Sequence, residues 1–178
     1  MKNLSVKKMS MIALFTSLLC ISAYITIPLP FTPTPITSQS IIVYMIGILF
    51  SPLESLLTLS LYILLGITGL PVFSGGKSGL NILFGPTGGY ILGWCIAVIV
   101  ISLLKGKKNN PKRYFFIIVF LGLPITYLLG SLTMKYNTNL YGTHLFYVTV
   151  LPFLPLDILK AILSSTLAYE LKKKLRNI

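Results

Sequence analysis

Residues 114–134 read YFFIIVFLGLPITYLLGSLTM, and this stretch decides the fold class. It carries no charged residue, and as a helix it is long enough to cross the ~30 Å hydrocarbon core of a bilayer. Inside lipid, the backbone groups of a single apolar segment are satisfied only within a helix. The stretch therefore predicts a transmembrane helix.

The rest of the chain has the same character. Hydrophobic residues make up 54% of the 178 residues and charged residues only 10%, and the mean hydropathy is +0.86. Soluble domains carry about a quarter charged residues, so this chain has too few to coat a packed core. The composition predicts an all-α integral membrane protein with a single domain over residues 1–178.

Six apolar segments predict six transmembrane helices, at 9–28, 37–50, 53–70, 86–104, 114–134 and 145–171. The first follows a basic start, as a signal peptide does, but it is longer than a typical signal peptide's apolar core, so we expect it to be retained. The second is short, and its polar start (Thr37, Ser38, Gln39, Ser40) predicts that it lines an aqueous cavity. Pro152 and Pro155 should break the early part of the sixth.

The basic residues predict the orientation. Twelve of the 15 lie in three clusters, near the N-terminus, after the fourth segment and in the tail: Lys2, Lys7, Lys8; Lys105, Lys107, Lys108, Lys112, Arg113; Lys172, Lys173, Lys174, Arg176. Cytoplasmic loops carry such an excess, so both termini are predicted to be cytoplasmic. The loops 29–36, 71–85 and 135–144 are then external. A net charge of +12 arranged in this way indicates a membrane rather than nucleic acid.

An acid and a base lie three residues apart in the apolar stretch LPLDILKAIL, residues 154–163. Asp157 and Lys160 share a helix face at this spacing. The pair could be a purely structural lock, but ionisable groups inside a membrane cost about 2.5–3.5 kcal/mol each and usually mark a functional site.

The external loop 71–85 contains the glycine-rich run SGGKSG, residues 74–79. Its glycines permit close approach of the backbone to a ligand. Lys77 could simply be solvated, or it could hold a ligand carboxylate together with Lys160 and helix N-terminal amides. The run lacks the spacing of a phosphate-binding P-loop. Tyr90 and Trp94, four residues apart, could form one wall of a pocket.

Small residues recur every four positions in two segments. Gly85, Gly89, Gly93 and Ala97 predict close helix packing. Ala13 and Ser17 form a weaker pair, which would suit docking against another membrane protein.

The remaining polar residues predict no catalysis. Glu54 is expected to cap a helix N-terminus, and His144 lies in a predicted loop with no paired carboxylate. Cys20 and Cys95 lie within apolar segments, which favours packing over a disulfide or a metal site. We therefore predict neither an enzyme nor a cofactor.

Three stretches together resemble the BioY family, the biotin-binding S components of energy-coupling factor (ECF) transporters. They are IPLPFTPTPITSQS (27–40), GLPVFSGGKSG followed by GPTGGY (69–79 and 85–90), and DILKA (157–161). The resemblance covers essentially the whole chain. It implies six helices, an external biotin pocket, a transmembrane T component as partner, two cytoplasmic ATPases and a bacterial plasma membrane location.

The resemblance also implies roles for particular residues. Asp157 and Lys160 match the ligand-contacting pair of the family, while Lys77 stands where many members carry Asn or another residue. Ala13 and Ser17 stand where the family usually has Ala-x-x-x-Ala for docking to the T component. The full set of expected biotin contacts is Asp157, Lys160, Lys77, Gly75, Gly76, Gln39, Tyr90, Phe73 and Trp94.

The sequence leaves two other functions as alternatives. A stand-alone secondary transporter often has two related halves with broken helices, and no such halves are evident in this sequence. An intramembrane enzyme would need a catalytic set that the motifs do not supply.

Overall fold

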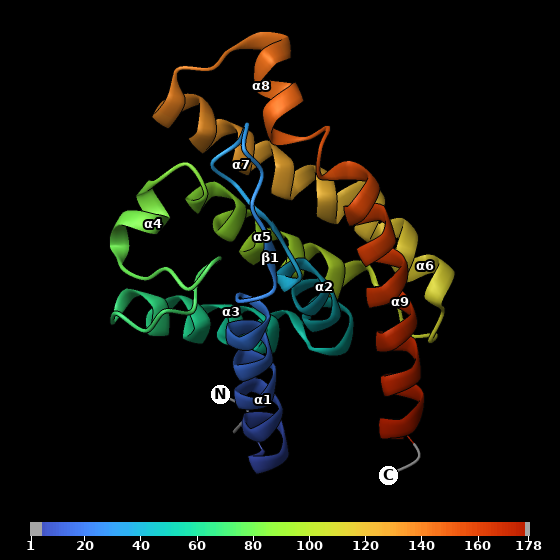
Figure 1. Ribbon diagram of the computed structural model, residues 1–178. Coiled ribbons are helices and arrows are strands. Elements are labelled where there is room, and N and C mark those ends of the chain that lie inside the picture. The colour runs from blue at the N-terminus through green and yellow to red at the C-terminus, as the bar shows by residue number, and fades with distance from the viewer. Residues whose placement is uncertain (1–4, 177–178) are drawn as a thin grey trace.

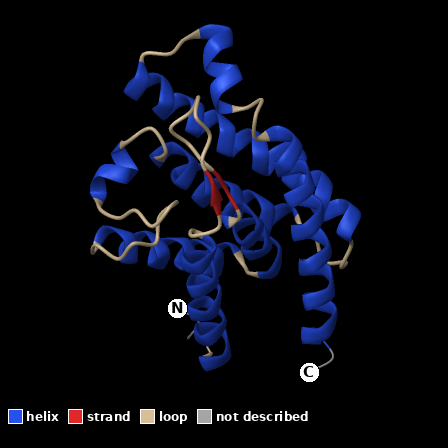
Figure 2. Ribbon diagram, in the orientation of Figure 1, coloured by secondary structure: helices blue, strands red, loops and turns tan. Residues whose placement is uncertain are grey.

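The computed structural model describes residues 5–176 and consists of packed helices, which confirms the all-α class (Figures 1 and 2). Lys2 lies outside the described residues, as does the side chain of Arg176, so their places in the basic clusters stay predictions. The helices are α1 (Val6–Ser22), α2 (Gln39–Leu49), α3 (Pro52–Ile67), α4 (Leu80–Phe84), α5 (Gly88–Leu104), α6 (Pro111–Ile117), the π-helix η1 (Ile118–Gly122), α7 (Leu123–Thr138), α8 (Gly142–Thr149) and α9 (Leu154–Arg176). Two short strands, β1 (Thr26–Ile27) and β2 (Ile36–Thr37), pair antiparallel.

The uncharged stretch 114–134 lies inside one continuous helix. Helices α6, η1 and α7 join into 28 residues from Pro111 to Thr138, and within residues 5–176 this is the one helix long and apolar enough to cross a membrane. The π-helical turn ends at Gly122, two residues before Pro124. Proline removes a backbone donor from the helical ladder, which accounts for a wider turn at this point.

The last apolar segment is divided as its prolines predict. Helices α8 and α9 are bent by 43° at a short break, and together they pass the same test for a membrane span. Pro152 lies in the break and Pro155 in the first turn of α9. The predicted interruption is confirmed, although α8 begins at Gly142 and so places His144 in a helix rather than in a loop.

Other segment boundaries differ from the prediction. Helix α1 ends at Ser22, and the chain turns into β1 where Pro28 and Pro30 prevent a helix from continuing. The predicted loop 71–85 contains the short helix α4. Helix α7 runs beyond residue 134 to Thr138, through mostly polar residues. It ends there because Asn139 adopts a left-handed conformation with a φ of 53°.

Helix α5 packs against α2, α3 and α7. A Cβ atom on Gly89 would lie 2.1 Å from the Leu129 carbonyl oxygen, and one on Gly93 would lie 2.8 Å from the Thr126 Cα atom. Side chains at either position would force α5 and α7 apart. The predicted role of small residues in packing is therefore confirmed for these two glycines, whereas Gly85 precedes α5.

The end of the molecule where α1 begins is held by charge contacts. Ser51 and Glu54 form a capping box at the start of α3, which confirms the capping role of Glu54. The same carboxylate pairs with Lys8 at 2.7 Å and so joins α1 to α3. The ammonium group of Lys105, at the end of α5, donates to the Phe50 carbonyl at the end of α2. Figure 1 shows that α1 begins and α9 ends at this same end of the molecule.

Candidate ligand-binding site

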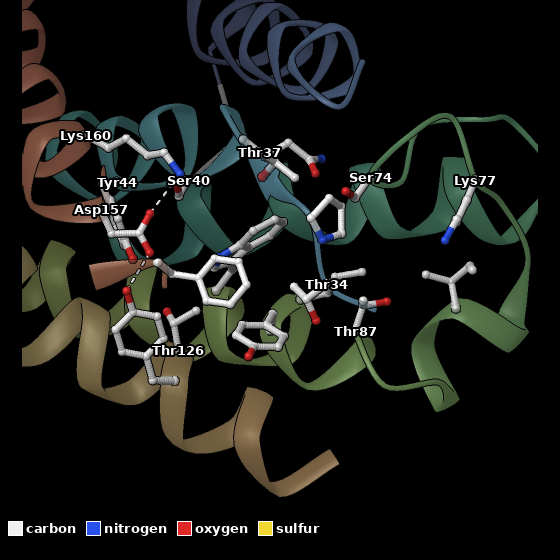
Figure 3. A pocket seen from close by; sticks show the side chains of 18 residues that line it. Thr34, Thr37, Ser40, Tyr44, Ser74, Lys77, Thr87, Thr126, Asp157 and Lys160 are labelled. Carbon is white, nitrogen blue, oxygen red and sulfur yellow. Dashed lines mark hydrogen bonds and ion pairs between the residues drawn. The ribbon is translucent and has the colours of Figure 1, made fainter. Parts of the chain in front are cut away.

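A cavity that is partly open to the outside lies among the helices, the β1–β2 connection and the segment 71–87 (Figure 3). Eighteen side chains line it, and they come from α2, α5, α7, α9, strand β2, the β1–β2 connection, the segment 71–87 and the break between α8 and α9. The predicted cavity role of the polar start of α2 is confirmed for Thr37, Gln39 and Ser40, whereas Ser38 instead donates to the Ser22 carbonyl.

The acid and base of α9 face this cavity. Lys160 Nζ donates to Asp157 Oδ1 at 2.8 Å, and the Tyr127 hydroxyl donates to Asp157 Oδ2 at 2.6 Å. Asp157 is only 8% exposed. Each carboxylate oxygen thus has a partner within the protein, and this satisfies a charge that would otherwise be costly to bury.

Four polar atoms in the cavity wall have no partner. In the part of the chain that the structure describes, the buried side-chain oxygens without a hydrogen bond belong to Thr34, Gln39, Ser40 and Ser74. All four residues line this one cavity. Native proteins leave few buried polar groups unpaired, because each costs roughly 1–3 kcal/mol. A polar ligand bound in this cavity could supply the missing hydrogen bonds to these four oxygens.

Aromatic rings supply the apolar wall. Tyr90, Trp94 and Phe153 line the cavity, and the ring centroids of Tyr90 and Phe153 are 6.4 Å apart. The Tyr90 hydroxyl donates to the Thr149 carbonyl at 3.0 Å, which fixes the ring against α8. The predicted use of Tyr90 and Trp94 as a pocket wall agrees with their positions.

Six of the nine expected ligand contacts meet in the cavity lining: Asp157, Lys160, Lys77, Gln39, Tyr90 and Trp94. Phe73, Gly75 and Gly76 lie outside it. Phe73 is fully buried against Tyr62, with ring centroids 5.6 Å apart. Gly75 and Gly76 adopt positive φ angles of 73° and 72°, and Gly75 N–H donates to the Ala23 carbonyl. These three residues shape the loop that carries Ser74 and Lys77, and their own contact with a ligand stays a prediction.

Sequence reasoning missed several lining residues. Thr34, Tyr44, Ser74 and Thr126 are uncharged and sit in apolar or proline-rich surroundings, so their spacing gives no signal. Tyr127 was missed for the same reason, since only the fold brings it to Asp157, 30 residues away. Ala13 and Ser17 lie exposed on α1, well outside the cavity lining.

Fold and site together define a helical membrane protein with a partly open cavity, lined by polar and aromatic side chains, that suits a small ligand. The family model described as the BioY family matches residues 1–177, and the chain belongs to that family.

Named relatives agree in length as well as in sequence. The "Biotin transporter BioY" of Thermotoga maritima is 35% identical over 160 residues, which cover 90% of this chain and 92% of that protein. The "Probable biotin transporter BioY" of Pyrococcus horikoshii is 32% identical over 166 residues, covering 93% and 96%. The crystal structure of an S-component for biotin from an ECF-type ABC transporter superposes with a TM-score of 0.86 at 25% identity and covers 97% of this chain and 94% of that one. These relatives are transporters and not enzymes.

Proposed function

We propose that this chain is the biotin-binding S component of an ECF transporter, which captures biotin for uptake driven by partner subunits. One observation carries the proposal. In a chain of the BioY family, the buried Asp157–Lys160 pair and four unpaired buried oxygens all face one cavity among apolar helices.

The chemistry of biotin matches this wall. Its ureido group offers N–H donors and a carbonyl acceptor, and its fused rings are apolar. Asp157 accepts hydrogen bonds, Lys160 donates them, and the aromatic side chains contact the ring system. When the site is empty, the carboxylate and the ammonium neutralise each other, which lowers the cost of keeping both within the membrane.

We further propose a single domain with six transmembrane segments and both termini in the cytoplasm of a bacterial cell. Twelve of the 15 basic residues support this arrangement by their three clusters. So does the common end at which α1 begins and α9 ends. Large apolar side chains such as Ile21, Phe120 and Leu128 point outward and suit contact with lipid.

The energy for uptake would come from partners. We propose a transmembrane T component, docked partly through Ala13 and Ser17 of α1, and two cytoplasmic ATPases. Both α1 residues are exposed, and the Ser17 hydroxyl bonds back to the Ala13 carbonyl at 3.0 Å, which leaves a smooth surface for a neighbouring helix.

Binding of the purified protein to a panel of vitamins tests the proposal. Calorimetry should detect tight binding of biotin and none of thiamine, riboflavin or folate. Uptake assays in cells with and without the T component and the ATPases separate this role from that of a stand-alone transporter. Binding of another vitamin in place of biotin, or full uptake without the ATPases, would contradict the proposed function.

A further inference from the structure

Gln39, the first residue of α2, is a fully buried residue whose side-chain amide lines the cavity. Its Nε2 atom donates to the Tyr62 hydroxyl at 2.7 Å, whereas its Oε1 atom makes no hydrogen bond. The oxygen and the nitrogen of an amide lie on opposite sides of one planar group. The bond to Tyr62 therefore decides which of the two atoms is left for a ligand, and that atom is the oxygen.

Tyr62 lies on α3 and does not itself line the cavity. Its side chain is fully buried, and its ring meets that of Phe73 edge to face, with ring centroids 5.6 Å apart. Phe73 also lies against Gly66, one turn further along α3, where a Cβ atom would come within 2.1 Å of the Phe73 ring. The packing thus fixes the Tyr62 hydroxyl, which holds Gln39 from a neighbouring helix.

The unpaired Oε1 atom of Gln39 differs in chemistry from the other three unpaired oxygens of the cavity wall. Those three belong to serine and threonine hydroxyls, which can either donate or accept a hydrogen bond. An amide oxygen only accepts. Because Nε2 is already bonded to Tyr62, Gln39 requires a donor on the ligand, and without one its oxygen carries the cost of an unsatisfied buried group.

We propose that Tyr62 is a positioning residue, which holds the Gln39 amide so that Oε1 accepts a hydrogen bond from one N–H group of the ureido ring of biotin. This assignment rests on the proposed function. The two N–H groups of a cyclic urea point away from each other, so the carboxylate of Asp157 serves one of them and the other needs a second acceptor. The bond to Tyr62 prevents the amide from turning and presenting its nitrogen instead, and such preorganisation favours binding.

A double-mutant cycle on biotin affinity tests the inference, by calorimetry on the purified full-length protein with the melting temperature recorded alongside. Gln39→Met keeps a side chain of similar length and removes the acceptor, so it should weaken biotin binding about 10-fold. Tyr62→Phe removes one oxygen atom and frees the amide to turn, so it should weaken binding about 3- to 10-fold. The double variant should bind no more weakly than Gln39→Met alone, because Tyr62 acts through Gln39.

The matched control is Tyr114→Phe. Tyr114 is also fully buried, and its hydroxyl donates to the side-chain oxygen of Asn109 at 3.0 Å, but it does not line the cavity. This variant should lower the melting temperature and leave biotin affinity unchanged. Wild-type affinity in either single variant of the cycle, or losses that multiply in the double variant, would overturn the positioning role. If the wild-type protein did not bind biotin, the proposed function itself would fail, and the two failures are thus distinguishable.

Discussion

The Tyr127 hydroxyl donates a 2.6 Å hydrogen bond to Oδ2 of Asp157 and so ties α7 to the first turn of α9. Lys160 holds the other carboxylate oxygen from the same helix as Asp157. Only the tyrosine therefore fixes the carboxylate relative to the opposite wall of the cavity. We expect Tyr127 to position Asp157 for the ligand.

Tyr127→Phe should weaken biotin binding about 10-fold and lower the melting temperature, because it removes one hydrogen bond to a buried charge. Calorimetry and thermal unfolding on the same sample measure both effects. Tyr136→Phe, on the exposed side of the same helix (76% exposed), is the control and should change neither. Wild-type affinity in Tyr127→Phe would mean that Lys160 alone orients Asp157.

Gly89→Ala should destabilise the protein by about 1–3 kcal/mol or prevent folding, since a Cβ atom there meets the Leu129 carbonyl at 2.1 Å. Unfolding in detergent, followed by circular dichroism, measures the change. Leu92→Ala on the lipid-facing side of α5 (49% exposed) is the matched substitution and should cost little. Equal stability of the two variants would argue against close packing of α5 on α7.

Single cysteines test the proposed topology. In a background with Cys20→Ala and Cys95→Ala, Asn81→Cys should react with an impermeant thiol reagent in intact cells, and Lys108→Cys should react only after the membrane is opened. Both parent residues are exposed, so the membrane alone decides access. The reverse pattern would invert the orientation and make the cavity cytoplasmic.

Substitution of the small residues on α1 by tryptophan tests the proposed docking surface. Ala13→Trp and Ser17→Trp should reduce co-purification with the T component and reduce uptake, while biotin binding stays normal, because a bulky residue prevents close approach of a neighbouring helix. Phe120→Trp, on another outward-facing helix (65% exposed), controls for added bulk in lipid. Normal uptake by both α1 variants would move the docking surface elsewhere.

The sequence predicted the parts of the fold that depend on local composition. Residues 114–134 contain no charge and lie inside a long helix, and Pro152 marks the break before α9. The boundary of α1 was missed, because apolar residues run on past Ser22 and only the pairing of Ile27 with Ile36 shows that they leave the helix. Hydropathy does not distinguish a short extended hairpin from the end of an apolar helix.

The sequence predicted the charged residues of the site, because charged residues are rare in this chain. Asp157, Lys160 and Lys77 stand out in a chain with 10% charged residues, and all three line the cavity. Tyr127 and Thr34 give no such signal, because their importance lies in tertiary contacts: a hydrogen bond across two helices in one case and an unsatisfied oxygen in the other.

The most direct test of the central claim is the biotin affinity of Asp157→Asn and Lys160→Ala, measured by calorimetry on monodisperse protein with the melting temperature recorded alongside. If both residues contact biotin, Asp157→Asn should weaken binding by about 10- to 150-fold, the equivalent of 1.5–3 kcal/mol. Lys160→Ala should cost at least as much, since it leaves the buried Asp157 without its cation. Near-normal affinity in both variants, with melting temperature alone reduced, would contradict the account and make the pair a structural lock.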